Sequence, residues 1–119
     1  AHPRSCVLAY WHRPRFSSGM HGNYRDLDAL WRILAAAHAD VVLTGHDHDY
    51  ERFAPMNADG EANPAGVTQF VAGTGGASHY KFRTPGLTSK VRITGRYGVL
   101  RLQLMERAYG WEFMAAPKR

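Results

Sequence analysis

Three histidines stand beside apolar runs in a pattern that could bind a metal ion. His12 follows the apolar run 6–11, and His46 and His48 follow the run 41–44 after a single glycine, Gly45. Neutral imidazole is the most common protein ligand for zinc, iron and similar ions. Residues two apart in an extended chain point the same way, so His46 and His48 could serve one metal ion or two neighbouring ions. We expect Gly45 to let the backbone approach such an ion closely.

The segments around these histidines predict a strand, a helix and a second strand. Residues 6–11 are apolar without alternation, which predicts a strand buried on both faces, with the single cysteine, Cys6, as a small buried residue. Residues 41–44 predict a second strand of the same kind. Such a βαβ unit implies parallel strands, whose carboxyl ends share one edge of the sheet. His12, His46 and His48 are therefore expected at one rim.

The predicted helix runs from about residue 24 to residue 39. Its apolar face is Leu27, Leu30, Trp31 and Leu34, which follow the helical period. Asn23 or Asp26 is a candidate for its N-terminal cap.

The second half of the chain predicts loops and mostly antiparallel strands. Residues 57–66 have the composition of a loop, residues 67–76 form a strand that runs into a glycine-rich turn, and residues 78–89 are expected to be irregular. Alternating apolar residues from 100 to 104 and from 109 to 113 predict a hairpin whose turn lies at about residues 107 and 108.

Composition and charge narrow the class of protein. The chain has 119 residues, 45% hydrophobic and 21% charged, which fits one soluble globular domain. No apolar run is long enough to span a membrane, and the sequence carries no signal of cellular location. No acid occurs between Glu61 and Glu106, although that interval holds six lysines and arginines. Such a surface attracts anions, whether phosphorylated substrates, nucleic acid or an acidic partner, but a solvated basic face fits equally well.

Simpler interpretations apply to single residues. Nothing patterned surrounds His38 or His79, so both are predicted to be surface residues. Asp47 and Asp49 are interpreted as turn formers.

The motif as a whole is more specific, because "GHDHDYERF" resembles the last metal-binding motif of the calcineurin-like metallophosphoesterases. It is most similar to their purple acid phosphatase-like branch. "YWHRPRFSSGMHG" looks like the motif before it, and "FVAGTGGAS" resembles the glycine-rich strand end that follows. The order and spacing agree, and these segments cover most of the chain.

The resemblance implies a dinuclear site that hydrolyses phosphate esters. It assigns His12 and His46 to one metal ion and His48 to the other, the ions being iron, zinc or manganese in divalent or trivalent form. His21 matches a histidine that contacts the phosphate or protonates the leaving alcohol. Tyr50, Glu51 and Arg52 look like framework residues of the turn, and Asp47 occupies a variable position without a role. The family is often exported, although the sequence itself leaves the location open.

The chain departs from the family in one respect. The earlier motifs of the family, including a Gly-Asp with a bridging aspartate and a Gly-Asn-His, have no match here. We therefore expect residues 1–119 to form one partial domain, the C-terminal half of an αββα sandwich, with a βαβ unit followed by mostly antiparallel strands. Metal occupancy in this chain alone would be partial or absent. The missing N-terminal half, or self-association, would cover its exposed apolar strands.

Three functions remain open on the sequence. The chain is predicted to be part of a metallophosphoesterase, active within a larger domain. The alternative is a catalytically incompetent module that binds a metal ion or an anion and self-associates. A nucleic-acid binder that uses the acid-free interval ranks below both, because its aromatic residues follow no known module.

Overall fold

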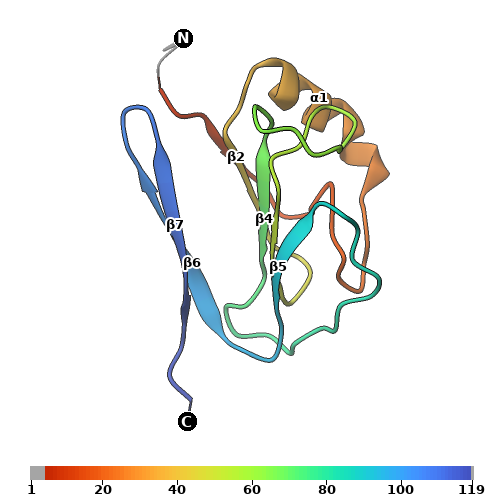
Figure 1. The fold of residues 1–119 in the computed structure, drawn as a ribbon. Helices are drawn as coiled ribbons and strands as arrows, with labels where there is room; N and C mark the ends of the chain where they lie inside the picture. The colour runs from red at the N-terminus through yellow and green to blue at the C-terminus, as the bar shows by residue number, and fades with distance from the viewer. Residues whose placement is uncertain (1–4, 119) are drawn as a thin grey trace.

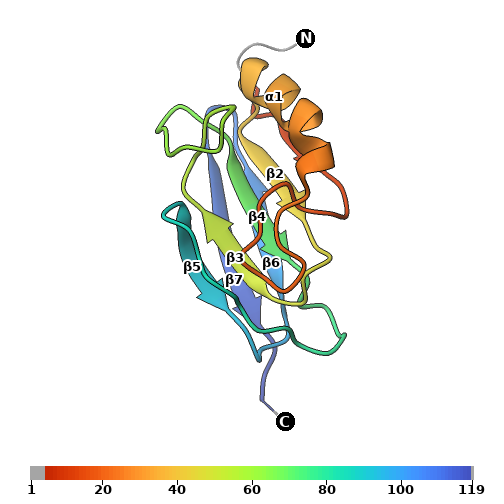
Figure 2. The same cartoon turned by 90° about the vertical axis from the view of Figure 1, so that its right-hand side faces the viewer.

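The computed structural model describes residues 5–118, which form three layers (Figure 1). A five-stranded sheet lies in the middle. The helix α1 (Asp28–Ala36) and long loops cover one face, and a hairpin of two strands covers the other. Figure 2 gives the view from the helical side. No helix in residues 5–118 is long and apolar enough to cross a membrane.

The central sheet combines parallel and antiparallel strands. Its strands, in chain order, are β1 (Leu8–Tyr10), β2 (Val41–Thr44), β3 (Tyr50–Phe53), β4 (Thr68–Ala72) and β5 (Ser89–Ile93). Their order in the sheet is β1-β2-β4-β3-β5; β1, β2 and β4 are parallel, whereas β3 is antiparallel to both its neighbours. The predicted βαβ unit is therefore confirmed, and the antiparallel strands follow it as expected.

The first strand is shorter and more exposed than the sequence predicts. β1 lies at the edge of the sheet, and Tyr10 is 77% exposed, so the prediction of a strand buried on both faces is wrong. Cys6 is only half-buried, and its thiol lies 3.3 Å from the carbonyl oxygen of Ala108 in the hairpin turn. An apolar sequence shows only that a segment carries no charge. The number of faces of a strand that are covered depends on the position of the strand in its sheet.

The helix begins later than predicted. A 3₁₀ turn, η1 (Arg25–Leu27), precedes α1, and neither element has a side-chain N-cap. The prediction of Asn23 or Asp26 as the cap is therefore wrong. The Oδ1 atom of Asn23 instead accepts a hydrogen bond from the backbone N–H of Ser17 and so holds a loop. Asp28, in the first turn of α1, is instead hydrogen-bonded to Arg32.

The end of α1 has a specific geometry. His38 has a φ of 55°, in the left-handed region, and its N–H donates to the carbonyl oxygen of Ala35. The N–H of Ala39 donates to Leu34, which completes a Schellman motif. His38 thus stops the helix where glycine is more common.

Each face of the sheet has its own hydrophobic core. On the helical face the fully buried Trp31 packs with Val42 and Val71, and on the hairpin face Val41 and Phe70 lead a second cluster. Neighbouring residues of β2 and β4 therefore supply opposite cores, as the two-residue period of a strand requires.

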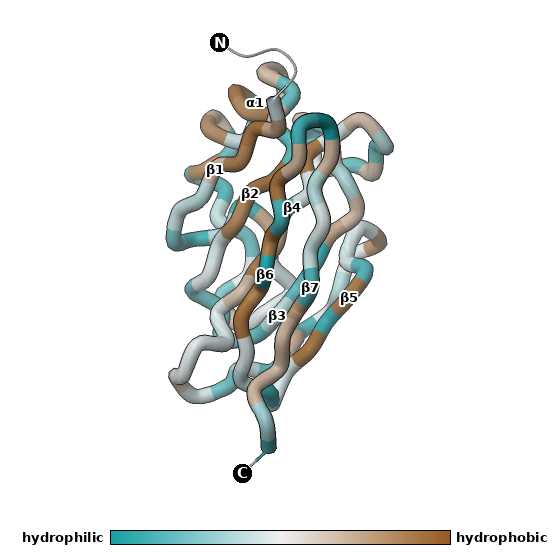
Figure 3. Tube along the Cα trace, turned by 90° about the vertical axis from the view of Figure 1, so that its left-hand side faces the viewer, coloured by the Kyte–Doolittle hydropathy of each residue, from teal (hydrophilic) through white to brown (hydrophobic). Residues whose placement is uncertain are grey.

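The hairpin consists of β6 (Gly98–Leu104) and β7 (Tyr109–Ala115) and confirms the predicted alternation. Leu100, Leu102 and Phe113 pack against the sheet, and the Phe113 ring stacks on Tyr50 at 4.5 Å between centroids. Figure 3 shows hydrophobic residues along β1 and β2, alternating hydrophobic and hydrophilic residues along β6, and a hydrophilic turn at the tip of the hairpin. Within residues 5–118, α1 and the 3₁₀ turn η1 lie on one side of the two β layers only.

Two strands are not evident from the sequence. β3 is short, and its central residues Glu51 and Arg52 are charged, so no apolar run marks it in the sequence. β5 has an alternating sequence, "SKVRI", and begins at the last residue of the segment 78–89 that is expected to be irregular; residues 90–93 carry no prediction of their own. Its alternation was a usable signal.

Candidate functional site

His12 and His46 meet at the carboxyl edge of the parallel strands. Hydrogen bonds from Trp11 to Leu43 and from Gly45 to His12 continue the pairing of β1 and β2 beyond their ends. As a result, the Nε2 atom of His12 and the Nδ1 atom of His46 are 3.0 Å apart. The prediction that these two residues share one rim agrees with the structure.

His46 occupies an unusual backbone position. Its φ is 69°, in the left-handed region, whereas the space around Gly45 is open. His46 itself makes the turn, and the close approach of the Gly45 backbone to an ion stays a prediction. A non-glycine residue with a left-handed backbone conformation is strained and persists only where the surrounding structure holds it. Such residues are found most often at functional sites. The Tyr24 hydroxyl, 2.8 Å from the Nε2 atom of His46, helps to hold the ring.

The surroundings of His46 favour its neutral form. Burial, and then the nearby His21 and His12, lower the pKa of the His46 imidazole below its ordinary value of 6.5. The rings of His21 and His46 lie 4.2 Å apart between centroids. Only the neutral imidazole offers a lone pair to a metal ion, so this shift favours metal binding.

The spacing of His12 and His46 fits two ligands of one ion. Ligand nitrogens about 2.0–2.1 Å from a metal, at angles between about 90° and 109°, lie roughly 2.8–3.4 Å from each other. The observed 3.0 Å between the two imidazole nitrogens falls in that range. A direct N–H···N hydrogen bond gives the same spacing when no ion is bound.

His48 projects from the same turn and is held in a defined orientation. Its Nδ1 atom donates to the carbonyl oxygen of Ser78 at 2.6 Å, and its ring stacks on Tyr80 at 4.0 Å between centroids. A metal-binding histidine commonly donates its second ring nitrogen to a carbonyl group in this way. The Nε2 atom of His48 thus keeps its lone pair for a ligand.

His21 is paired with a buried carboxylate. Its Nδ1 atom lies 2.7 Å from the Oδ1 atom of Asp47, which also accepts the backbone N–H of His21 at 3.0 Å. The Ser17 hydroxyl lies 2.5 Å from the other oxygen of Asp47. Asp47 is completely buried. The assignment of Asp47 as a variable turn residue without a role is therefore wrong, because it orients His21.

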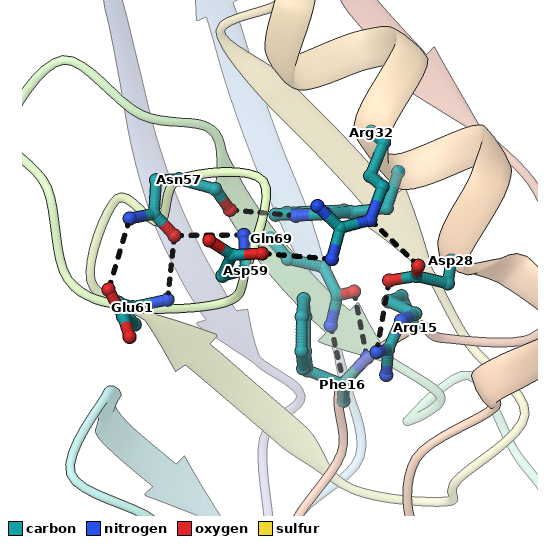
Figure 4. Close-up of polar contacts among 9 residues, drawn as sticks. Arg15, Phe16, Asp28, Arg32, Asn57, Asp59, Glu61 and Gln69 are labelled. Carbon is teal, nitrogen blue, oxygen red and sulfur yellow. Dashed lines mark hydrogen bonds and ion pairs between the residues drawn. The ribbon is translucent and has the colours of Figure 1, made fainter.

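The loop that carries His21 is attached to the sheet at two further points, of which Figure 4 shows the first. The side chain of Gln69, on β4, bonds both the N–H and the carbonyl group of Phe16. Glu51, on β3, accepts the backbone N–H of Ser18 at 2.8 Å. A Cβ atom on Gly19 would lie 2.6 Å from Asp49 Oδ2, so the loop needs glycine there.

The helix is tied to a second loop in the same region. Arg32 bridges Asp28 at 2.8 Å and Asp59 at 2.9 Å, and Asp28 also accepts a bond from Arg15 (Figure 4). The two ion pairs of Arg32 lie at the surface, so their contribution to stability is small, whereas the pair of Arg15 and Asp28 is partly buried. They fix the helical layer beside the loop that carries the site.

Three acids lie beneath the histidines. Asp47, Asp49 and Glu51 are all completely buried. Glu51 also accepts a hydrogen bond from the Ser89 hydroxyl. Asp49 has no hydrogen-bond partner in the described part of the chain, and burial, followed by the charges of Asp47 and Glu51, raises its pKa to about 7. Asp49 is therefore partly protonated at neutral pH.

The described residues contain no complete group of metal ligands. Across residues 5–118, no group of three or more histidine, cysteine, aspartate or glutamate side chains is arranged to hold a metal ion. The histidine pair His12 and His46 and the oriented His48 fit as ligands, while the buried acids face the protein interior. Further ligands would have to come from outside these residues.

The sequence did not predict three contacts to the histidines, which are made by Tyr24, Ser78 and Tyr80. Each contacts a histidine of the rim from a loop whose composition gives no warning of it. His79, predicted to be a simple surface residue, is half-buried, with its Nε2 atom enclosed and its ring against Tyr97 at 4.2 Å.

Solved structures resemble this fold. The purple acid phosphatase PPD1 from seeds of yellow lupin (Lupinus luteus) matches 91% of this chain with a TM-score of 0.73 and 23% sequence identity. GAP50, described as the anchor in the inner membrane complex of Plasmodium, matches 92% with a TM-score of 0.70 and 18% identity. The chain spans 22% of the first protein and 32% of the second. No family model and no curated protein sequence matches it.

These likenesses establish the calcineurin-like phosphoesterase fold, and the expected resemblance is confirmed at that level. At such low sequence identity they do not extend to the reaction.

Proposed function

We propose that this chain, which has the calcineurin-like phosphoesterase fold, contributes one wall of a dinuclear site that hydrolyses phosphate esters. The spacing of His12 and His46 carries the proposal, because 3.0 Å between two imidazole nitrogens suits ligands of one ion. His48, with its Nδ1 atom bonded to Ser78, is the ligand proposed for the second ion. When bound, two such ions polarise the phosphoryl oxygens and lower the pKa of the attacking water.

His21 is the proposed acid for the leaving group. Asp47 holds its Nδ1 atom at 2.7 Å, so the Nε2 atom is the one that faces a substrate. A protonated imidazole in this orientation can give its Nε2 proton to the departing alkoxide. The ring lies beside His46, so the donated proton would arrive next to the metal ligands.

The assay that tests this proposal measures turnover of p-nitrophenyl phosphate, a chromogenic phosphate ester, by the complete protein in the presence of zinc, iron or manganese. His46→Ala should abolish turnover and reduce the bound metal. His21→Ala should keep the metal and lower kcat by about 10²–10⁴-fold. His38→Asn is the matched control, because Asn tolerates the left-handed conformation of His38 far from the rim. Full turnover by His46→Ala would refute the enzyme proposal.

A non-catalytic binding module is the second candidate. It is favoured by one observation: residues 5–118 contain no complete group of metal ligands. The likeness to GAP50, which is described as an anchor, is compatible with a role in binding alone. Metal binding that depends on His12 and His46, with no turnover of any phosphate ester by the complete protein, would support this alternative.

A further inference from the structure

A hollow lies at the same end of the molecule as the histidines. Its volume is about 710 Å³, and its lining includes Gly75, Gly76, Arg96, Tyr97 and Lys118. Its position follows from the topology: two hydrogen bonds join Thr74, directly after β4, to Gly98 at the start of β6. Because β4 runs parallel to β2, Thr74 lies at the edge that also carries His46. The hollow is therefore a neighbour of the histidine rim, with different lining residues.

The hollow is positively charged. Arg96, half-buried, and Lys118 both line it, and neither side chain has a hydrogen bond or an ion pair within residues 5–118. No acid lines it, and its lining residues from Gly75 to Tyr97 belong to the interval 62–105, which contains no acid. Unpaired cations in a concave surface concentrate the field and attract anions.

The glycine-rich loop adds neutral donors to these charges. The backbone N–H groups of Gly75 and Gly76 have no partner among the described residues, and both glycines leave open space where a side chain would stand. Free backbone N–H groups beside an arginine fork form the arrangement that suits phosphoryl oxygens.

An aromatic wall completes the hollow. Tyr97 is 44% exposed, and His79 supports its ring from the protein side at 4.2 Å between centroids. An exposed ring supported in this way offers a flat surface to a sugar or a base. A hollow of this volume also fits a small organic molecule better than a bare ion.

We propose that this hollow binds the phosphoryl end of a small organic phosphate, with Arg96, Lys118 and the backbone N–H groups of Gly75 and Gly76 as its ligands. The proposal does not depend on hydrolysis, because none of these residues belongs to the histidine rim.

Calorimetric titration of the complete protein with inorganic pyrophosphate tests it. A chelator is present throughout, so that metal at the histidines does not contribute. We expect binding that weakens with salt, and a dissociation constant about 10-fold higher in Arg96→Ala, which corresponds to about 1.4 kcal/mol. Lys118→Ala should weaken binding as well, which keeps the test valid if Arg96→Ala does not fold. The control is Arg107→Ala, an exposed arginine in the turn at the far end of the hairpin, which should change affinity less than about two-fold.

Three results would overturn the proposal. The first is the absence of pyrophosphate binding by the wild type. The second is loss of binding in His46→Ala together with unchanged binding in Arg96→Ala and Lys118→Ala, which would place the anion at the histidine rim. The third is equally tight binding of citrate at the same residues, which would show a general anion surface without preference for the phosphoryl group.

Discussion

Asp49 makes the stability of the protein depend on pH in a predictable direction. Its carboxyl group is completely buried without a hydrogen-bond partner in residues 5–118, and its pKa is raised from 3.8 to about 7, first by burial and then by Asp47 and Glu51. In the unfolded chain the same group ionises near 3.8. Between these two values the unfolded state holds fewer protons than the folded state, so the free energy of unfolding must fall as the pH rises.

The size of the effect follows from the two pKa values. One pKa unit corresponds to about 1.4 kcal/mol, so the full shift is worth about 4 kcal/mol. The linkage relation places about 2–3 kcal/mol of this loss between about pH 5 and about pH 8. This is a large fraction of the stability of a small domain.

Asp49→Asn removes the ionisation and nearly keeps the shape of the side chain. Urea unfolding with a chelator present, at about pH 5 and about pH 8, should show the variant gaining about 2–3 kcal/mol on the wild type as the pH rises. Histidines that titrate in both proteins cancel in this difference. Asp26→Asn, an exposed acid, is the control and should show a constant difference from the wild type. A variant whose advantage is unchanged or smaller at the higher pH would refute this account of Asp49.

Two further variants test how the rim is held. Tyr24→Phe removes the hydroxyl group 2.8 Å from His46 Nε2, so zinc affinity measured by calorimetry should fall about 10–100-fold; unchanged affinity would mean that Tyr24 does not orient the ring. Gly73→Ala should cost about 1–3 kcal/mol in urea unfolding, because a Cβ atom there would collide with the backbone carbonyl group of Asp47. Gly75→Ala, with open space around it, is the matched control, and an equal loss in both variants would contradict the collision.

The fold around the histidines was largely predictable from local patterns. Residues 41–44 and 100–104 form strands where apolar runs and alternation place them, and the βαβ unit brings His12 to His46. Periodicity succeeds here because burial on a sheet follows the two-residue period of the strand. It is less informative at the edge, where Tyr10 is apolar in sequence and exposed in space.

Long-range polar contacts account for what the sequence did not predict. Asn23 has the composition of a helix cap, yet its side chain serves Ser17. Asp47 has the composition of a turn former, yet it is the buried partner of His21, 26 residues away in the chain. Side-chain oxygens of this kind can bond locally or at a distance, and only the folded backbone determines which donors come within reach.

The alternation from His46 to Glu51 links the rim to the loop beneath it. His46 and His48 are half-buried at the edge of the sheet. The acids that stand between and after them in the chain are completely buried, namely Asp47, Asp49 and Glu51. A buried carboxylate is tolerated when donors surround it. Asp47 and Glu51 obtain theirs from the loop that carries His21, while Asp49 has none and avoids the cost of burial through its raised pKa.

The same short motif therefore has two structural tasks. One set of its residues presents imidazoles to a ligand, and the other fixes the loop that positions His21. Loss of Asp47 would leave buried donors of that loop unpaired, each at a cost of about 1–3 kcal/mol, and would release His21 even if all the proposed metal ligands remained. The position between the two histidines thus bears on the site through an element distant in sequence, whether the site catalyses hydrolysis or only binds.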